Sequence, residues 1–474
     1  MIRLTALHGV TLTTVMALAG CCTPAPISES VLDCGSRSVA IVVEPSLLPS
    51  IRDGLTQFEG DLCTYGYCTV EHSGGFANPA VLRAYLQNLY KGSNHHLVGV
   101  ILIGDVPHAY QWVTMHSANP NIPDLSEEVI SFQYYADLDG TFARSPAYTS
   151  PGGHAYSFDL HSGPVEWEIW VGVLPRYKGD VKQTIAAMSR YFTKNHNFRT
   201  RQLLRQNVFL QINEHFHATT LAEHNTLMTA MRSGTYSWSP YSNDATARLY
   251  FDSPPAGLTV QQGYTDMQNG LADFTVADAH GNWAASGQLT IATVESNPVL
   301  TLIFWSNGCA VGDLDHAENF LTSVLYSPTS DVLIAKGTTN SSGGMGNNTN
   351  GYFGHNIATF LTADRSFGEA ILGHVNVPLI APWAGDREFF FGSVVVLGDP
   401  TLRRSSDWWE QESYAADCAS RPQGTVCVRY DDGYSWLVRD SIQRWEMHGS
   451  VQTAVGYAAR YEHILGTDSI RQNH

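Results

Sequence analysis

The chain has 474 residues, and 27 Lys and Arg against 44 Asp and Glu give it a formal net charge of −17 at pH 7. This excess of negative charge repels nucleic acid and anionic lipid, so the composition argues against a nucleic-acid-binding protein. A hydrophobic content of 43% with 11% aromatic residues is ordinary for a folded protein, and the length predicts more than one domain or subdomain.

The N-terminus is typical of an exported protein. Residues 1–21 combine a basic start, an apolar stretch and small residues, which is the composition of a signal peptide. The segment Leu18–Cys21 resembles a bacterial lipobox and predicts lipid attachment at Cys21; a plain secretory signal cut nearby is the alternative. The polar residues 22–36 would then tether the protein to the membrane. Cys22 after the lipidated residue favours the outer membrane or the cell surface.

The cysteine count agrees with an oxidising compartment. The eight cysteines are Cys21, Cys22, Cys34, Cys63, Cys68, Cys309, Cys418 and Cys427. A lipidated Cys21 and a reactive Cys309 leave six, an even number suited to disulfides. Short loops predict the pairs Cys63–Cys68 and Cys418–Cys427, and elimination leaves Cys22–Cys34. The alternative is that Cys309 is one of several buried thiols.

Strands and helices are expected to alternate over residues 37–200. The expected strands are Val39–Glu44, Thr69–Glu71, Leu97–Ile103 and Trp167–Leu174, and the expected helices are Pro49–Glu59, Ala80–Tyr90 and Gly179–His196. Such alternation predicts a parallel sheet with helices on both faces. The continuous apolar run Leu97–Ile103 predicts the central strand of this half.

A similar alternation follows over residues 201–404. The expected strands are Asn207–Ile212, Ala247–Phe251, Phe274–Ala277, Val299–Trp305, Asp331–Lys336 and Phe389–Leu397, and the expected helices are Val260–Asn269, Phe320–Tyr326 and Ser366–His374. The flexible stretch Gly337–Gly351 is either a substrate-facing loop or a plain surface loop. Residues 405–474 change in character: an Asp-Gly turn within Val428–Val438 predicts a hairpin, and Val451–Leu465 a closing helix.

Two of these apolar strands lead to residues that do acyl-transfer chemistry. Phe274–Ala277 leads to His280 and Gly281, and Val299–Trp305 leads to Cys309. Ligands of open α/β sheets bind beyond the carboxyl ends of the strands, so we expect the His and the Cys to meet there. An imidazole that takes the thiol proton makes a thiolate nucleophile. The backbone N–H groups of Gly281 and Cys309 are candidates for an oxyanion hole.

His-Gly after one strand and Asn-Gly-Cys-Ala after the next resemble the gingipain family of cysteine peptidases, within the caspase-like clan. Four further segments are similar to motifs of that family: Leu97–Tyr110, Gln133–Gly140, Glu168–Pro175 and Val394–Arg403. The resemblance covers residues 37–404 and departs from the family at Val173, where the family carries Arg. It implies a caspase-like α/β fold, a mostly parallel sheet with flanking helices in two subdomains. These are an N-terminal one over residues 37–200 and a catalytic one over residues 201–404, with residues 405–474 as a small C-terminal extension.

Together with the N-terminal signal, the resemblance implies an exported, lipid-anchored cysteine endopeptidase that acts on protein or peptide substrates and requires no cofactor. Cys309 would be the nucleophile and His280 the general base and acid. Glu168 stands where the family's strand carries an acidic residue, which implies a preference for Arg or Lys before the scissile bond. Trp283 and Trp305 are candidate walls of the pocket, although core packing explains both as well.

Asp137 and Asp139 lie in the turn of the Tyr-Tyr-Ala-Asp-Leu-Asp-Gly segment. Two carboxylates one residue apart are suited to Ca²⁺, and members of the gingipain family bind calcium, so a structural calcium site is one interpretation. The other is a plain Asp-Gly turn, because the segment offers too few ligands for an EF-hand loop.

Two further functions are compatible with the sequence. A catalytically silent surface-binding lipoprotein on the same scaffold would keep the fold and lose the chemistry. A transpeptidase would use the same acyl-enzyme and pass it to an amine instead of water.

Overall fold

The computed structural model describes residues 37–93, 96–116, 121, 123–200, 202–203, 208–214, 247–251, 259–341, 366–376 and 391–403, with three short strands nearer the C-terminus. The signal peptide, the tether, Cys21, the expected pairs Cys22–Cys34 and Cys418–Cys427, most of the 337–351 loop and the expected helix Val451–Leu465 lie outside these residues.

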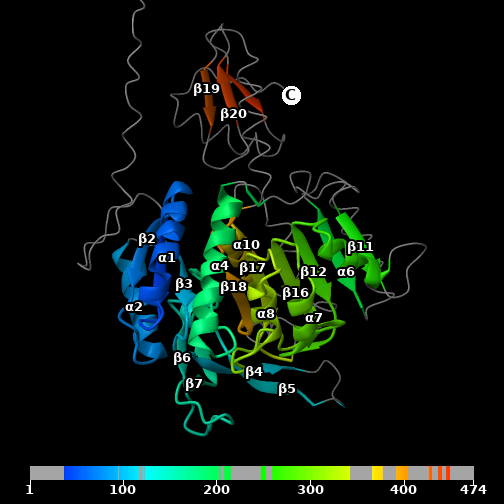
Figure 1. The fold of residues 1–474 in the computed structure, drawn as a ribbon. Coiled ribbons are helices and arrows are strands. Elements are labelled where there is room, and N and C mark those ends of the chain that lie inside the picture. The colour runs from blue at the N-terminus through cyan, green and yellow to red at the C-terminus, as the bar shows by residue number, and fades with distance from the viewer. Residues whose placement is uncertain are drawn as a thin grey trace, which may run out of the picture.

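One ten-stranded sheet runs through the described part of the chain, in the order β11-β10-β12-β16-β17-β18-β9-β3-β1-β2. Figure 1 shows the blue N-terminal strands at one end of this sheet and β11 and β12 towards the other. The strands are β1 Ser38–Val43, β2 Cys68–His72, β3 Leu97–Ile103, β9 Trp170–Leu174, β10 Phe209–Asn213, β11 Ala247–Phe251, β12 Phe274–Asp278, β16 Ile303–Ser306, β17 Ile334–Thr338 and β18 Val394–Gly398.

β18 is the reversed strand of an otherwise parallel sheet. It pairs antiparallel with β17, and the strands from β11 to β17 and from β9 to β2 are parallel to their neighbours. Lys178, four residues after β9, pairs with Glu318 in the loop that follows Cys309, and Tyr110, after β3, donates to Asp315 of the same loop. The carboxyl ends of β9, β3 and β1 therefore lie at the same edge of the sheet as those of β12, β16 and β17. The fold is a mainly parallel α/β sheet with flanking helices, as expected, and β3 is the central strand of its half.

The helices lie against this sheet (Figure 1). They are α1 Leu48–Thr64, α2 Pro79–Gly92, α3 Gln133–Ala136, α4 Val181–Arg199, α6 Val260–Gln268, α7 Ile291–Ser296, α8 Phe320–Tyr326 and α10 Phe367–Val375. Local chemistry explains several of their starts. Asn78 accepts from the Val81 N–H and Pro79 occupies the first turn of α2, while Ser366 and Glu369 form a capping box on α10. α1 packs on α4, with the Phe58 and Phe192 rings 5.5 Å apart.

Smaller sheets surround the large one. They are built from β4 Tyr110–Met115, β5 Leu125–Ile130, β6 Thr141–Ala143, β7 Ser157–Phe158, β8 Leu160–Ser162, β13 Gly281–Asn282, β14 Ala285–Ser286 and β15 Leu289–Thr290. The predicted C-terminal hairpin is confirmed, because β19 Val426–Arg429 pairs antiparallel with β20 Trp436–Arg439, and β21 Trp445–His448 extends it.

The return strand β18 is anchored by a buried ion pair. The Asp399 carboxylate follows β18 and accepts from Arg199 of α4 at 2.5 Å and from Asn195 at 2.9 Å. Arg199 and Asp399 are both buried. β18 also pairs with β9, where Leu397 faces the buried Val173. A strand from the predicted catalytic subdomain thus completes the sheet of the N-terminal one.

The predicted Cys63–Cys68 disulfide is wrong. Cys68 keeps its thiol, while Cys63 is disulfide-bonded. Cys309 also keeps its thiol. The reason is the turn at Gly66, with φ of 79°, which carries the chain from the end of α1 into β2, where Cys68 pairs with Ser38.

Candidate functional site

Adjacent parallel strands present His280 and Cys309 at the same edge of the sheet. β12 pairs with β16 from Phe274↔Ile303 to Ala277↔Ser306. His280 and Cys309 each follow the last paired residue of their strand by three positions. His280 is exposed and Cys309 partly buried, so both can reach a substrate at this edge.

The two turns that carry these residues touch each other. A Cβ atom on Gly281 would lie 2.8 Å from the Gly308 Cα, and one on Gly308 would lie 3.2 Å from the Gly281 Cα. Both positions also crowd the Val311 side chain. Because any larger residue would force the turns apart, glycine at both positions keeps the imidazole and the thiol on neighbouring backbones.

A hydrogen-bonded chain of side chains joins the ends of the two strands. The Trp305 indole N–H donates to Asn307 Oδ1 at 2.7 Å, and Asn307 Nδ2 donates to Asp278 Oδ1 at 3.4 Å. The Asn307 N–H also donates to the Ala277 carbonyl at 2.9 Å. All these groups are buried, so they fix the spacing between the strand that leads to His280 and the turn that leads to Cys309.

The turn at Cys309 is held on both sides by its backbone. The Gly308 N–H donates to Ser306 Oγ at 3.0 Å, and the Ala310 N–H donates to the Asn340 carbonyl at 2.6 Å. Ala310 has φ of 50°, a left-handed conformation that costs a non-glycine residue about 1 kcal/mol or more. A strained backbone held from both sides places the Cys309 sulfur and N–H in one orientation.

Gly281 is suitably placed to offer its N–H. It opens the hairpin β13–β14 and lies opposite Ser286. The Gly287 N–H donates to the His280 carbonyl at 2.7 Å, which makes that pair hydrogen-bonded. In an antiparallel ladder bonded and non-bonded pairs alternate, so the next pair, Gly281 and Ser286, is non-bonded. The Gly281 N–H therefore points away from β14, as an oxyanion donor must.

Trp305 does not wall a substrate pocket. Its side chain is fully buried, because β16 lies in the middle of the sheet. The Nζ of Lys336, on the paired residue of β17, lies 4.3 Å from the Trp305 ring centre. Burial lowers the pKa of Lys336 to about 7. The pocket assignment is wrong for this residue, and its alternative, core packing, is what the structure shows.

Trp283 has the opposite environment. It lies in the turn of the β13–β14 hairpin, three residues after His280, and is 41% exposed. Its ring stacks on that of His316, with 4.5 Å between centroids and 12° between planes. Trp283 therefore remains available as a wall beside the His280 turn, and it packs against the loop that follows Cys309.

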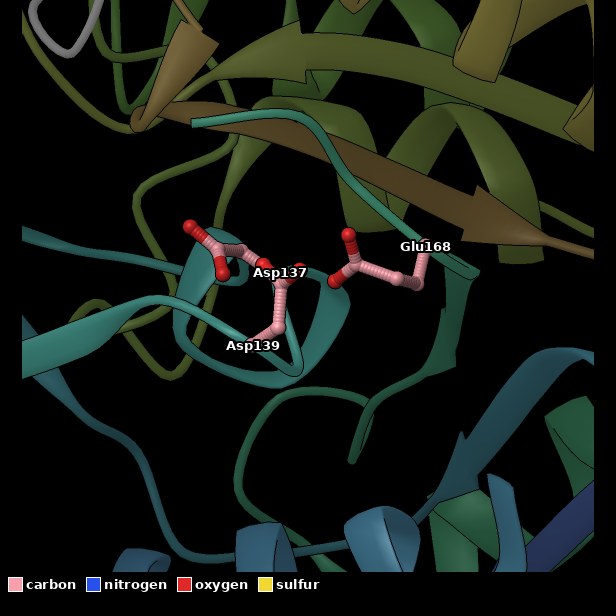
Figure 2. A group of neighbouring side chains, drawn as sticks. All are labelled: Asp137, Asp139 and Glu168. Carbon is pink, nitrogen blue, oxygen red and sulfur yellow. The ribbon is translucent and has the colours of Figure 1, made fainter. Parts of the chain in front are cut away.

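Glu168 lies in an acidic cluster and not beside Cys309. It precedes β9 and therefore lies at the opposite edge of the sheet from Cys309, and three strand spacings, about 14 Å, also separate β9 from β16. One oxygen each of Asp137, Asp139 and Glu168 lie within 4.8 Å of one another. Figure 2 shows these side chains between the turn after α3 and the start of β9. The predicted role of Glu168 in the primary pocket is therefore not supported by its position.

The surroundings of this cluster are polar and partly charged. Glu168 accepts from the Leu138 N–H at 2.5 Å. Burial, followed by the negative charges of Asp139 and Asp137, raises the pKa of Glu168 to about 7. Asp137 Oδ2 is buried and lies 2.9 Å from His161 Nε2. Three mutually repelling carboxylates here are suited to a hard cation with oxygen ligands.

Arg83 of α2 occupies the carbonyl side of the same turn. Its guanidinium is buried and donates to the carbonyl oxygens of Tyr134, Asp137 and Gly140. These oxygens are therefore already in use, and a bound cation would rely on the three carboxylates. Sequence reasoning named the two aspartates and missed Arg83, His161 and the link to Glu168, since these come from distant segments.

The fold has known counterparts. Gingipain R, an Arg-specific cysteine proteinase, matches with a TM-score of 0.53 and 13% identity over 80% of each chain. A structure described as a protease matches with 0.55 and 12% identity over 88% of this chain and 91% of that one. A complex of the pro- and mature domains of Porphyromonas gingivalis RgpB matches with 0.51 and 14% identity, over 77% and 79%. No family model and no curated protein matches the chain. At such identities the likeness shows the fold alone.

Proposed function

We propose that the protein is a cysteine endopeptidase in which Cys309 is the nucleophile and His280 the general base and acid. The observation that carries this proposal is the contact between Gly281 and Gly308, which brings the residues after β12 and β16 together. A fold that resembles cysteine proteinases supports the same chemistry.

The reaction follows from the groups at this edge. The His280 imidazole takes the thiol proton as the Cys309 sulfur attacks the scissile carbonyl. The resulting oxyanion is stabilised by the N–H groups of Gly281 and Cys309. His280 then gives the proton to the leaving amine, which leaves a thioester on Cys309. Water, activated by His280, hydrolyses the thioester and restores the thiol.

Cleavage of a peptide library under mild reductant tests the nucleophile. We expect Cys309→Ala to abolish cleavage and His280→Ala to lower kcat/KM by about 10²-fold to 10⁴-fold, the usual contribution of a general base. Cys68→Ala is the matched control, because Cys68 carries a thiol outside the site, and it should cleave normally. Analysis of the products separates hydrolysis from transfer to an amine.

The same experiment reports on the alternative. A folded parent protein that cleaves nothing, and whose Cys309 reacts with iodoacetamide no faster than Cys68, would be the silent binding scaffold. We keep the preference for Arg or Lys as a hypothesis, although Glu168 does not lie beside Cys309. Better cleavage after neutral or acidic residues would reject it.

We also propose that the protein is exported and anchored by lipid at Cys21. Among the residues that the structure describes, no helix is long and apolar enough to cross a membrane. Metabolic labelling with an alkyne fatty acid should mark the parent protein and not the Cys21→Ala variant. Equal labelling of the parent protein and the Cys21→Ala variant would reject the lipid anchor at Cys21.

We propose that Ca²⁺ binds Asp137, Asp139 and Glu168 as a structural ion. The support is the close approach of three carboxylate oxygens and the raised pKa of Glu168. Calcium should raise the thermal midpoint of the parent protein and have little effect on Asp139→Asn. An equal response of the two proteins to calcium, or none in the parent, would favour the plain turn.

A further inference from the structure

A second crevice lies at the same edge of the sheet as Cys309, beyond the carboxyl ends of β1 and β3. It has a volume of about 550 Å³, within the range of sites that hold a small ligand or a side chain. Its walls come from residues after the carboxyl end of β1 (Glu44, Pro45), after that of β3 (Asp105 to His108) and before α2 (Gly75 to Ala77). β1 and β3 end at the same edge as β16, but four to five strand spacings, about 19 to 24 Å, separate them from it, so this crevice is separate from the dyad.

The topology makes this a place where α/β proteins bind ligands. The chain runs from β1 through α1 to β2 on one side, and from β2 through α2 to β3 on the other side of β1. The strand order therefore reverses between β1 and β3. Connections that leave in opposite directions open a crevice beyond the carboxyl ends of the two strands, and ligands of open sheets bind in such crevices.

The lining combines apolar surface with unbalanced negative charge. Val42, Val43 and Val106 form an apolar floor, and the Phe76 ring, stacked on His72 at 4.3 Å, forms a wall. Two carboxylates, Glu44 and Asp105, line the same space. The crevice therefore offers both a surface for methylene groups and a counter-charge for a cation.

The charges leave one carboxylate in excess. Glu44 is buried and paired with Arg176, whose Nε lies 2.9 Å away, so these two charges cancel. Asp105 is exposed and gives its backbone N–H to Glu44, which leaves its carboxylate at the mouth. Burial lowers the pKa of His108, so its imidazole adds no positive charge at neutral pH. Asp315, which accepts from the Tyr110 hydroxyl at 2.6 Å, adds negative potential nearby.

We propose that this crevice is a docking site for a Lys or Arg side chain presented by a protein or peptide partner. An apolar stem ending in a cation matches an apolar floor below a carboxylate, and the Phe76 ring adds a face on which a guanidinium stacks. Asp105 is the group that selects the cation. The site is independent of cleavage, so it stands or falls separately from the proposed peptidase activity.

Ligand-observed NMR titration of the full chain carrying Cys309→Ala tests this proposal. The probes are the blocked tripeptide Gly-Arg-Gly, its citrulline counterpart, which is neutral and nearly isosteric, and Gly-Glu-Gly. We expect the Arg peptide to bind most tightly. Asp105→Asn should lower the affinity for this peptide about fivefold, the effect of one exposed charge pair. Glu166→Gln removes an exposed carboxylate before β9 and should leave binding unchanged. Added salt should weaken binding in the parent more than in Asp105→Asn.

The proposal would be overturned by no binding of the Arg peptide at millimolar concentration, by equal binding of the citrulline or Glu peptide, or by equal weakening of binding in Glu166→Gln and Asp105→Asn. Unchanged binding in a folded Asp105→Asn protein would show that the Arg peptide binds at another site, which would also reject the proposal. If that variant does not fold, Phe76→Ala replaces it in the test. Loss of the stacking wall must weaken binding of the Arg peptide if the peptide occupies this crevice.

Discussion

Lys336→Met tests the energetic interpretation of the core beneath the dyad. Lys336 is 3% exposed, and Trp305 is the neighbour that its Nζ faces. Burial lowers its pKa from 10.5 to about 7. The unfolded chain therefore holds this proton up to a higher pH than the folded protein. Folding is penalised fully below pH 7, and the penalty fades as the pH rises towards 10.5.

The size of the effect follows from these two values. At about 1.4 kcal/mol for each tenfold change in proton affinity, the penalty is about 4 kcal/mol at pH 7 and about 2 kcal/mol at pH 9. Methionine has a similar length and volume, and its repacking costs less than about 1.5 kcal/mol. We therefore expect Lys336→Met to stabilise the protein by about 2 to 4 kcal/mol at pH 7, and by about 2 kcal/mol less at pH 9.

Urea unfolding of both proteins at pH 7 and pH 9 measures this difference directly. Lys194→Met is the matched control. The pKa of Lys194 is also lowered to about 7 by burial, but its ammonium donates to the carbonyls of Leu325 at 2.7 Å and Ser330 at 3.3 Å. Its removal leaves those oxygens unsatisfied, so the gain should be smaller or absent. A Lys336→Met protein that is less stable than the parent, or whose gain does not change with pH, would refute the reasoning.

Three further predictions concern single groups. Ala310→Gly should stabilise the protein by up to about 1 kcal/mol in thermal unfolding, because glycine adopts the φ of 50° without strain; a loss of stability would mean that the turn is not strained. Asp399→Asn should destabilise it by about 3 kcal/mol or more, since Arg199 is left buried without its partner, and a variant that melts with the parent would contradict that pairing. Glu168→Gln should stabilise the protein more at pH 8 than at pH 4. The pKa of Glu168 is raised to about 7 in the folded protein, so the parent protein loses stability as the pH rises above about 4.5, the pKa of this acid in the unfolded chain. An equal effect at both pH values would show that the carboxylate is not perturbed.

The pattern of apolar residues in the sequence was sufficient to predict much of the main sheet. β3, β11 and α8 lie where the sequence predicts them. For β3, whose residues are nearly all buried, the reason is that a strand covered on both faces needs a continuous apolar run whatever its neighbours are. The positions of His280 and Cys309 could likewise be predicted from the local sequence, since each residue closely follows its own strand. The strands β4 to β8 were missed, because short segments of mixed polarity leave no such pattern.

What the tertiary structure decided is which distant segments meet. Trp305 follows the same kind of apolar run as its neighbours, and only the pairing of β16 between β12 and β17 shows that it is core and not pocket. Glu168 is separated from Cys309 because β17 and β18 lie between β9 and β16, and because Glu168 precedes its strand whereas Cys309 follows its own. Cys63 and Cys68 are close in sequence but lie in different elements, the last turn of α1 and the start of β2. Sequence proximity and motif order determine which residues are presented at each strand end, whereas strand order, which depends on long-range packing, determines their partners.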